Sequence, residues 1–322
     1  MSPDSDDDVT VGSTDTPHAD RRRTWAATAL VLVVLAGAAI AIYRERHEFL
    51  DSLQRMGAWT ILGSVVFGLL GVGTTFPIWR EVLAGLGVPM PWGAGARVFF
   101  TSQLGKYLPG SVWPVVIQME AGRARGASRR TMLVANLATI LISCCVGLVL
   151  ACVLLPLHNG HALAQYWWAL VALPLLLAVL HPRAMPAVLD WLCGLLRRPP
   201  LGERLTVRSE VRASGWSLLS WAALGVHLDI LSAGVGHSGL STLILCTGGM
   251  ALAFSLGVLF IPAPAGAGIR DVVLTLTLTA SLTSGQALAV VVASRVILIA
   301  CDLTLASLAA LARRRTRLNL SS

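Results

Sequence analysis

The chain has 322 residues, of which 55% are hydrophobic and only 13% are charged, whereas soluble domains carry about 25% charged residues. With a mean hydropathy of +0.71, this composition excludes an ordinary soluble protein and indicates an integral membrane protein. The net charge is +8. The arginines fall between apolar runs, where basic residues orient helices and meet lipid headgroups, so we expect no binding to nucleic acid.

Residues 1–20 are rich in Asp, Ser, Thr and Pro, which predicts a disordered cytoplasmic tail. Residues 21–312 alternate long apolar runs with arginine-containing connections, which predicts one transmembrane domain, and a short basic tail follows over 313–322. Because hydrocarbon offers no water to unpaired backbone groups, we expect an all-α, polytopic helix bundle. The expected spans are near 25–43, 59–79, 131–155, 162–180, 216–235, 243–261, 270–284 and 286–311.

Two stretches of this domain allow alternative interpretations. Arg270 and Asp271 are the only charged residues between 236 and 285, so the charges do not decide whether 243–284 forms two crossings or one re-entrant hairpin. Eight spans, or six spans plus a hairpin, therefore both fit. The short apolar stretch 184–196 is expected to lie in the headgroup layer or to pack under the bundle.

The distribution of basic residues predicts the orientation. Segment 80–130 holds seven Arg or Lys residues and 156–165 holds none, so the first is expected in the cytoplasm and the second outside. Arginines after the last span place the C-terminus in the cytoplasm, and we expect the N-terminus there as well. Three arginines in 44–58 oppose this scheme. The expected location is the cell membrane.

The segment 92–118 is apolar, but helix-breaking residues interrupt it, and both of its ends join arginine-rich sequence. These residues are Gly105, Pro109, Gly110 and Pro114. Such a stretch is tolerated at membrane depth only where it packs in protein or lines a wet cavity, which predicts a re-entrant loop. Lys106, the only lysine of the chain, would then form an anion site with the N–H groups of a half-helix. Alternatively, it extends to the cytoplasmic surface and the prolines form an ordinary turn.

A second broken segment covers 261–271. Its helix-breaking residues are Pro262, Pro264, Gly266 and Gly268. The charged pair Arg270 and Asp271 follows directly. Paired breaks in the two halves of a transporter-like fold indicate a binding site, so we expect both segments to contribute to one site.

Three further ionisable residues lie inside apolar spans: Asp229, Arg295 and Asp302. Burial of such groups is costly, so we expect them to face the interior and to be paired. Arg295 and Asp302 are two helical turns apart and share one face. They form either a structural ion pair or part of a polar cavity, where the three residues would set the charge or relay protons.

Signatures of soluble enzyme chemistry are missing. The sequence contains no GxxxxGK[ST], HExxH or GxSxG pattern, and its six cysteines lie almost entirely inside apolar runs. We expect no metal and no cofactor, and no catalytic residue is assigned.

The two broken segments resemble the paired motifs of a membrane family. GKYLPGSVW at 105–113 and PAPAGAGIRD at 262–271 are similar to motifs of the flippase-like membrane domain of lysylphosphatidylglycerol synthases and their stand-alone relatives. The resemblance covers about residues 25–312. This chain has Arg270-Asp271 where the family usually has Arg-Glu.

The resemblance implies a function in lipid movement. In the two-domain synthases the membrane domain is implicated in moving aminoacylated phosphatidylglycerol, and a soluble C-terminal domain makes that lipid. This chain ends shortly after its last expected span, so we expect no lysyl transfer. Stand-alone relatives occur beside enzymes of polyprenyl-linked glycan assembly, which makes a glycolipid an equal candidate.

The leading hypothesis is a lipid translocase that binds an anionic headgroup in a polar cavity between the two breaks. Lys106 and Arg270 would contact phosphate, Asp271 would contribute to the same headgroup site, and Tyr107 and Trp113 would shape the cavity. One alternative is a non-transporting membrane partner of a glycosyltransferase or lipid-modifying enzyme. Another is a membrane-embedded enzyme acting on a lipid phosphate.

Overall fold

Every regular element in the described part of the chain is a helix, which confirms the expected all-α fold. The computed structural model describes residues 40, 43–107, 113–123, 127–158, 167–195, 205–259 and 268–318. The helices are α2 (Arg46–Arg55), α3 (Ala58–Gly73), α4 (Thr75–Gly85), α5 (Trp92–Gln103), the 3-10 helix η1 (Leu104–Tyr107), α6 (Trp113–Arg123), α7 (Arg129–His158), α8 (Trp167–Val179), α9 (Met185–Leu195), α10 (Val207–Gly234), α11 (Leu240–Leu259), α12 (Ile269–Leu278) and α13 (Ser284–Leu318).

Five helical stretches in the described residues are long and apolar enough to cross a membrane, so the chain is a multi-pass membrane helix bundle. They are Ala58–Gly85, Arg129–His158, Val207–Gly234, Leu240–Val258 and Ser284–Ala312. The first joins α3 and α4 through Thr74, whose backbone is helical. The expected span 25–43 lies almost entirely outside the described residues, and α8 covers residues 167–179 of the expected span 162–180.

The expected crossing at 270–284 is not formed. Helix α12 has 10 residues and is therefore only about 15 Å long, about half of the hydrocarbon thickness. Helix α11 is long enough to cross, so the region 243–284 consists of one spanning helix and one half-helix. The hydropathy of this region does not distinguish a short packed helix from a crossing.

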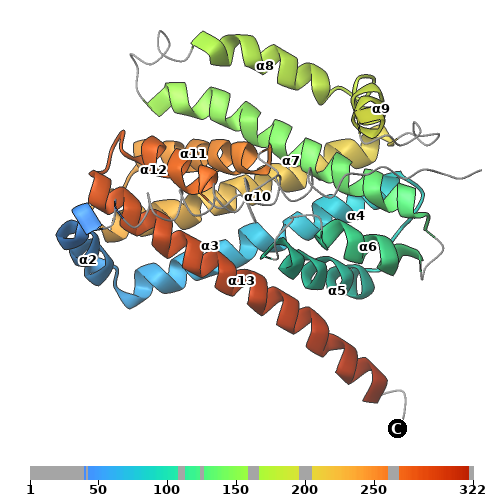
Figure 1. Cartoon of the computed structure of the whole chain (residues 1–322), viewed down its shortest axis with the longest axis horizontal. Coiled ribbons are helices and arrows are strands. Elements are labelled where there is room, and N and C mark those ends of the chain that lie inside the picture. The colour runs from blue at the N-terminus through green and yellow to red at the C-terminus, as the bar shows by residue number, and fades with distance from the viewer. Residues whose placement is uncertain are drawn as a thin grey trace, which may run out of the picture.

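Helix α10 contacts α3, α4, α7, α11 and α13, and in the view of Figure 1 it runs between α7 and α3. Glycines permit these close approaches. A Cβ on Gly225 would lie 2.0 Å from Oγ1 of Thr247 on α11, and one on Gly71 would lie 2.7 Å from the Leu224 side chain on α10. Small residues favour helix association in lipid because they let backbones approach closely.

We expect Gly225→Ala to lower the free energy of unfolding by about 1–3 kcal/mol, because the added methyl group overpacks the contact with Thr247. Gly215 on the same helix has no atom within 4 Å of its Cβ position. The matched control Gly215→Ala should therefore raise stability by up to about 1 kcal/mol through helix propensity. Denaturation in detergent, followed by circular dichroism, measures both. Equal stability of the two variants would contradict this packing argument.

The first broken segment folds back on itself. Helix α5 ends at Gln103, the chain tightens into η1, and α6 packs beside α5 (Figure 1). A Cβ on Gly105 would lie 2.9 Å from Cβ of Trp113, so only glycine permits this approach. Pro114 is the second residue of α6, where the N–H that proline lacks has no partner within the helix. Pro109 and Gly110 lie outside the described residues.

The second break ends at the start of α12. Gly268 has a φ of 92°, a left-handed conformation that favours glycine. Its N–H donates to Oδ2 of Asp271 at 3.2 Å, which satisfies one free backbone donor of the first turn. Pro262, Pro264 and Gly266 lie outside the described residues.

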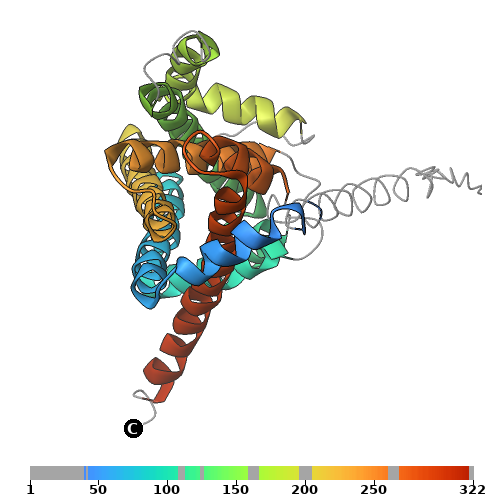
Figure 2. The same ribbon diagram turned by 90° about the vertical axis from the view of Figure 1, so that its left-hand side faces the viewer.

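Two further helices flank the bundle. Helix α9 turns Met185, Leu189 and Cys193 inward and leaves Trp191 exposed, so the predicted apolar stretch packs against α7 with one face uncovered. Helix α13 crosses α2 near its start, and its C-terminal part extends beyond the other helices (Figure 2). Its middle portion is the part that meets both broken segments.

Candidate functional site

Helix α13 carries two oppositely charged residues on one face, and each is paired with a different broken segment. Arg295 Nη1 lies 3.3 Å from Oδ1 of Asp271 at the start of α12. Asp302 Oδ2 lies 2.7 Å from Nζ of Lys106 in η1. Arg295 and Asp302 therefore do not form an ion pair with each other. They connect the two breaks to the same helix.

The Lys106 half of the site is built around a buried carboxylate. Asp302 is 4% exposed and accepts a hydrogen bond from the hydroxyl of Tyr107 at the same oxygen that faces Lys106. The Lys106 ammonium also lies 5.4 Å from the centre of the Tyr107 ring. Burial and the negative charge of Asp302 raise the pKa of Tyr107, so its hydroxyl stays protonated and donates. Lys106 is thus held by Asp302 in this structure.

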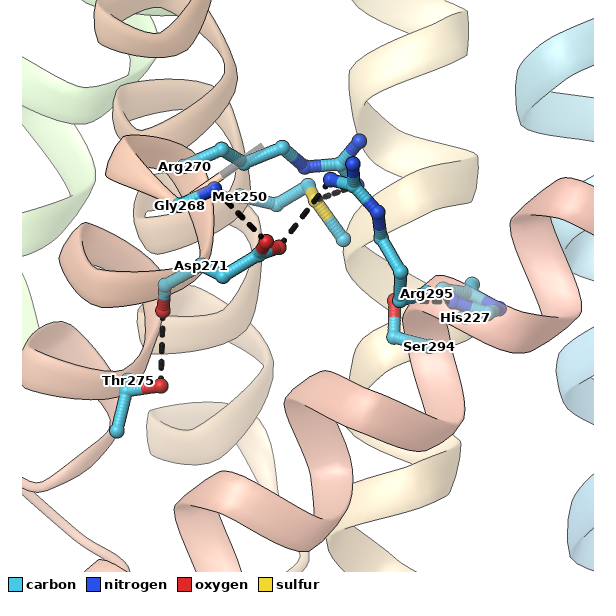
Figure 3. A network of polar contacts seen from close by, with 8 residues as sticks. All are labelled: His227, Met250, Gly268, Arg270, Asp271, Thr275, Ser294 and Arg295. Atoms are coloured by element: carbon cyan, nitrogen blue, oxygen red, sulfur yellow. Dashed lines mark hydrogen bonds and ion pairs between the residues drawn. The ribbon is translucent and has the colours of Figure 1, made fainter. Parts of the chain in front are cut away.

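The Arg270 half places two guanidinium groups beside each other (Figure 3). Arg295 pairs with Asp271, but Arg270 has no carboxylate within 4 Å among the described residues. Its Nη2 lies 3.5 Å from Sδ of Met250, and its Cζ lies 5.5 Å from the centre of the Phe254 ring. Its Nε is buried and makes no hydrogen bond to a described residue.

The protonation state of Arg270 follows from these surroundings. Burial, and then the positive charge of Arg295, lower the pKa of Arg270 to about 10. A pKa of that size leaves the group positively charged at neutral pH. The side chain therefore carries a full positive charge. Its buried part lies against the sulfur of Met250 and the ring of Phe254.

We call Lys106, Tyr107, Arg270, Asp271, Arg295 and Asp302 the charged cluster. Its formal charge is +1, because three cationic side chains face two carboxylates and Tyr107 is neutral. The cluster is accessible to a ligand, since the side chains of Lys106, Arg295 and Asp271 are 30%, 22% and 34% exposed. An electropositive, partly exposed group of this kind attracts anions.

Two other predicted site residues are placed differently. Trp113 packs against Gly105 and is 45% exposed, so it lies beside the turn that carries Lys106. Asp229 on α10 lies near Cys246 of α11. Its Oδ1 is buried without a hydrogen-bond partner among the described residues, and no ion pair joins it to the charged cluster in that part of the chain. A relay role for Asp229 stays a prediction.

His227, two residues before Asp229, is a buried polar residue to which the sequence analysis assigned no role. It is fully buried, and its Nε2 lies 2.9 Å from Oγ of Ser294, the residue before Arg295. Its Nδ1 lies 2.9 Å from the carbonyl oxygen of Ser64 on α3, which favours the tautomer that donates from Nδ1 and accepts from Ser294. His227 thus ties α3 and α10 to α13 beside the charged cluster. The signal available in the sequence was a histidine in an apolar span.

The chemistry of the site is that of charge pairing. Among the described residues, no group of three or more His, Cys, Asp or Glu side chains could hold a metal ion. Both carboxylates of the charged cluster are engaged by cations. The one formal charge without a counter-charge belongs to Arg270, and a guanidinium binds phosphate and carboxylate oxygens in pairs.

The chain matches one family model. The model described as the lysylphosphatidylglycerol synthase TM region matches residues 22–306, a range that includes both breaks and all six residues of the charged cluster. No curated protein matches the chain.

Proposed function

Because the chain belongs to the lysylphosphatidylglycerol synthase TM-region family, a family of membrane proteins linked to lipid metabolism or transport, we propose that it binds an anionic lipid headgroup at the charged cluster and moves the lipid across the bilayer. The observation that carries this proposal is Arg270, a charged side chain without a carboxylate partner among the described residues. It lies where two helix breaks from distant parts of the chain meet one spanning helix.

The surroundings of the charged cluster support a lipid rather than a soluble anion. Exposed apolar side chains lie on the same two helices as four residues of the cluster, among them Val272 and Leu276 on α12 and Val296 and Leu303 on α13. A lipid phosphate could occupy the charged cluster while its acyl chains stay against this apolar surface. The proposed substrates are anionic phospholipids and polyprenyl-linked glycolipids, and the proposed location is the cell membrane.

Half-helix α12 supports transport because broken helices allow two arrangements of a bundle. Ion pairs, the hydrogen bond from Tyr107 to Asp302 and side-chain packing hold α12 and η1 against α13 in the described part. A headgroup that competes for Arg295 or Lys106 would weaken these contacts. Opening of the charged cluster to either side of the membrane would then follow from rearrangement of these short elements.

The test is reconstitution of the purified chain into liposomes with a fluorescent short-chain phosphatidylglycerol in the inner leaflet. Its appearance in the outer leaflet is followed by chemical quenching. We expect protein to accelerate this movement and to accelerate the matched phosphatidylcholine analogue less, since its headgroup has no net charge. Movement at the rate of protein-free liposomes would refute transport by the chain alone.

A second candidate is a membrane partner that positions a glycosyltransferase or lipid-modifying enzyme. The observation in its favour is that four of the five charges of the charged cluster are already paired, as in a structural core. A partner of this kind would bind its enzyme but move no lipid in liposomes. Copurification of such an enzyme, together with a negative transport assay, would support it.

A further inference from the structure

The charge balance of the cluster points to a narrower class of ligand than an anionic lipid in general. We infer that the charged cluster selects a headgroup phosphate with one negative charge, a phosphodiester, over phosphomonoesters and diphosphates with two or more. This inference rests on the proposed function, because it names the substrate class of the same site.

Each of the two carboxylates of the cluster is engaged by a cation and by a hydrogen-bond donor. Asp302 is held by Lys106 and by the Tyr107 hydroxyl. Asp271 is held by Arg295 through Oδ1 and by the N–H of Gly268 through Oδ2. Neither carboxylate lies within ion-pair distance of Arg270 in the described part of the chain, so the cluster keeps a net formal charge of +1.

The position of this charge defines where a phosphate would bind. The guanidinium groups of Arg270 and Arg295 lie beside each other in Figure 3, and their two positive charges repel each other. One phosphate between them would relieve the repulsion and accept hydrogen bonds from both. The buried Nε of Arg270, unpartnered among the described residues, offers a further donor.

The same balance limits the charge of the ligand. One phosphodiester brings the formal charge of the cluster from +1 to zero. A second negative charge would be left without a counter-charge beside Asp271 and Asp302, in surroundings that include Phe254 and Met250. An unpaired charge in partly buried surroundings is costly, so a dianionic phosphate binds more weakly or must first take up a proton.

The test compares short-chain lipids that differ in phosphate charge. Isothermal titration of the detergent-purified full chain would use dihexanoyl-phosphatidylglycerol, a diester, and dihexanoyl-phosphatidic acid, a monoester. At about pH 8 the monoester is mostly dianionic, since its second pKa is near 6. We expect the diester to bind at least about tenfold more tightly. Equal affinities, or tighter binding of the monoester, would overturn the inference.

Dimethyl phosphate and inorganic phosphate separate a lipid site from a general phosphate site. Both lack acyl chains. If the exposed apolar side chains on α12 and α13 contribute to binding, dimethyl phosphate should displace phosphatidylglycerol only at a concentration much higher than that of the lipid. Displacement of phosphatidylglycerol by inorganic phosphate at equal concentration would contradict both the charge rule and a lipid headgroup as the ligand.

Asp271→Asn tests the charge rule within the protein. The substitution raises the formal charge of the cluster to +2 while the amide oxygen still accepts from Gly268, so the preference should shift toward phosphatidic acid by about tenfold. Asp51→Asn, which removes an exposed carboxylate paired with Arg55 on α2, is the control and should leave the preference unchanged. Asp302→Asn makes the same charge change and replaces Asp271→Asn if that variant does not fold.

The outcomes separate this inference from the proposed function. Binding of both lipids without a charge preference, or an unchanged preference in Asp271→Asn and Asp302→Asn, refutes the charge rule but leaves a headgroup site in place. Failure of all four ligands to bind the folded wild-type chain refutes the headgroup site as well.

Discussion

Arg270→Gln is expected to reduce the movement of a labelled anionic lipid by at least about thirtyfold, because removal of a charge from a desolvated contact costs about 2–5 kcal/mol. Glutamine keeps hydrogen-bond donors but removes the charge that has no carboxylate partner among the described residues. The initial rate of quencher-accessible lipid in liposomes measures this effect. Arg270→Lys should retain part of the rate, since it keeps the charge but not the paired donors.

Stability distinguishes a binding role of Arg270 from a structural one. Its charge is partly buried and without a counter-charge among the described residues, so Arg270→Gln should leave the melting temperature unchanged or raise it. Arg123→Gln is the control for activity, since this exposed arginine lies on α6 beside Glu120. A wild-type transport rate in Arg270→Gln, or a loss of rate that only follows loss of folded protein, would contradict the proposed role.

Lys106→Met is expected to destabilise the chain more than Asp302→Asn does. Without Lys106, the nearly buried carboxylate of Asp302 keeps only the Tyr107 hydroxyl, a loss of about 2–3 kcal/mol after allowance for the exposed part of Lys106. In Asp302→Asn, Lys106 can turn toward water, and the asparagine still accepts a hydrogen bond from Tyr107. The expected loss in the free energy of unfolding is therefore only about 1 kcal/mol. Thermal and denaturant unfolding in detergent measure both.

The double variant Lys106→Met/Asp302→Asn completes the cycle. It removes both charges, so its stability should lie closer to the wild type than that of Lys106→Met. The exposed pair Asp51 and Arg55 serves as the control, with an expected change below about 0.5 kcal/mol for Asp51→Asn. Additive losses in the double variant would show that the pair of Lys106 and Asp302 contributes no coupling energy.

The contrast between His227 and Asp229 shows a limit of reasoning from the sequence. Both lie in the same apolar span, and their positions differ by two residues, so they point to different sides of α10. His227 contacts Ser64 on α3 and Ser294 on α13, whereas Asp229, whose Oδ1 is also buried, lies near Cys246 of α11. The sequence shows that a polar residue is buried there, but the packing of neighbouring helices determines which of the two faces the charged cluster.

Several features of this fold depend on local chemistry and can be read from the sequence. Apolar length and composition specified a helical membrane bundle, glycine and proline specified where its helices break, and a separation of seven residues placed Arg295 and Asp302 on one face. Whether 270–284 crosses the membrane was not determined locally, since the charges of this region fit either a crossing or a re-entrant hairpin.

Which charges meet depends on how the helices pack against one another. Tyr107 and Asp302 are 195 positions apart in the chain, and nothing in their local sequence specifies the contact. Three cations compete for two carboxylates, and the packing of η1 and α12 against α13 assigns Lys106 to Asp302 and Arg295 to Asp271. Arg270 is left without an ion pair in the described part, because each carboxylate pairs with the cation that the fold places within reach. The distance between the two residues along the chain does not matter.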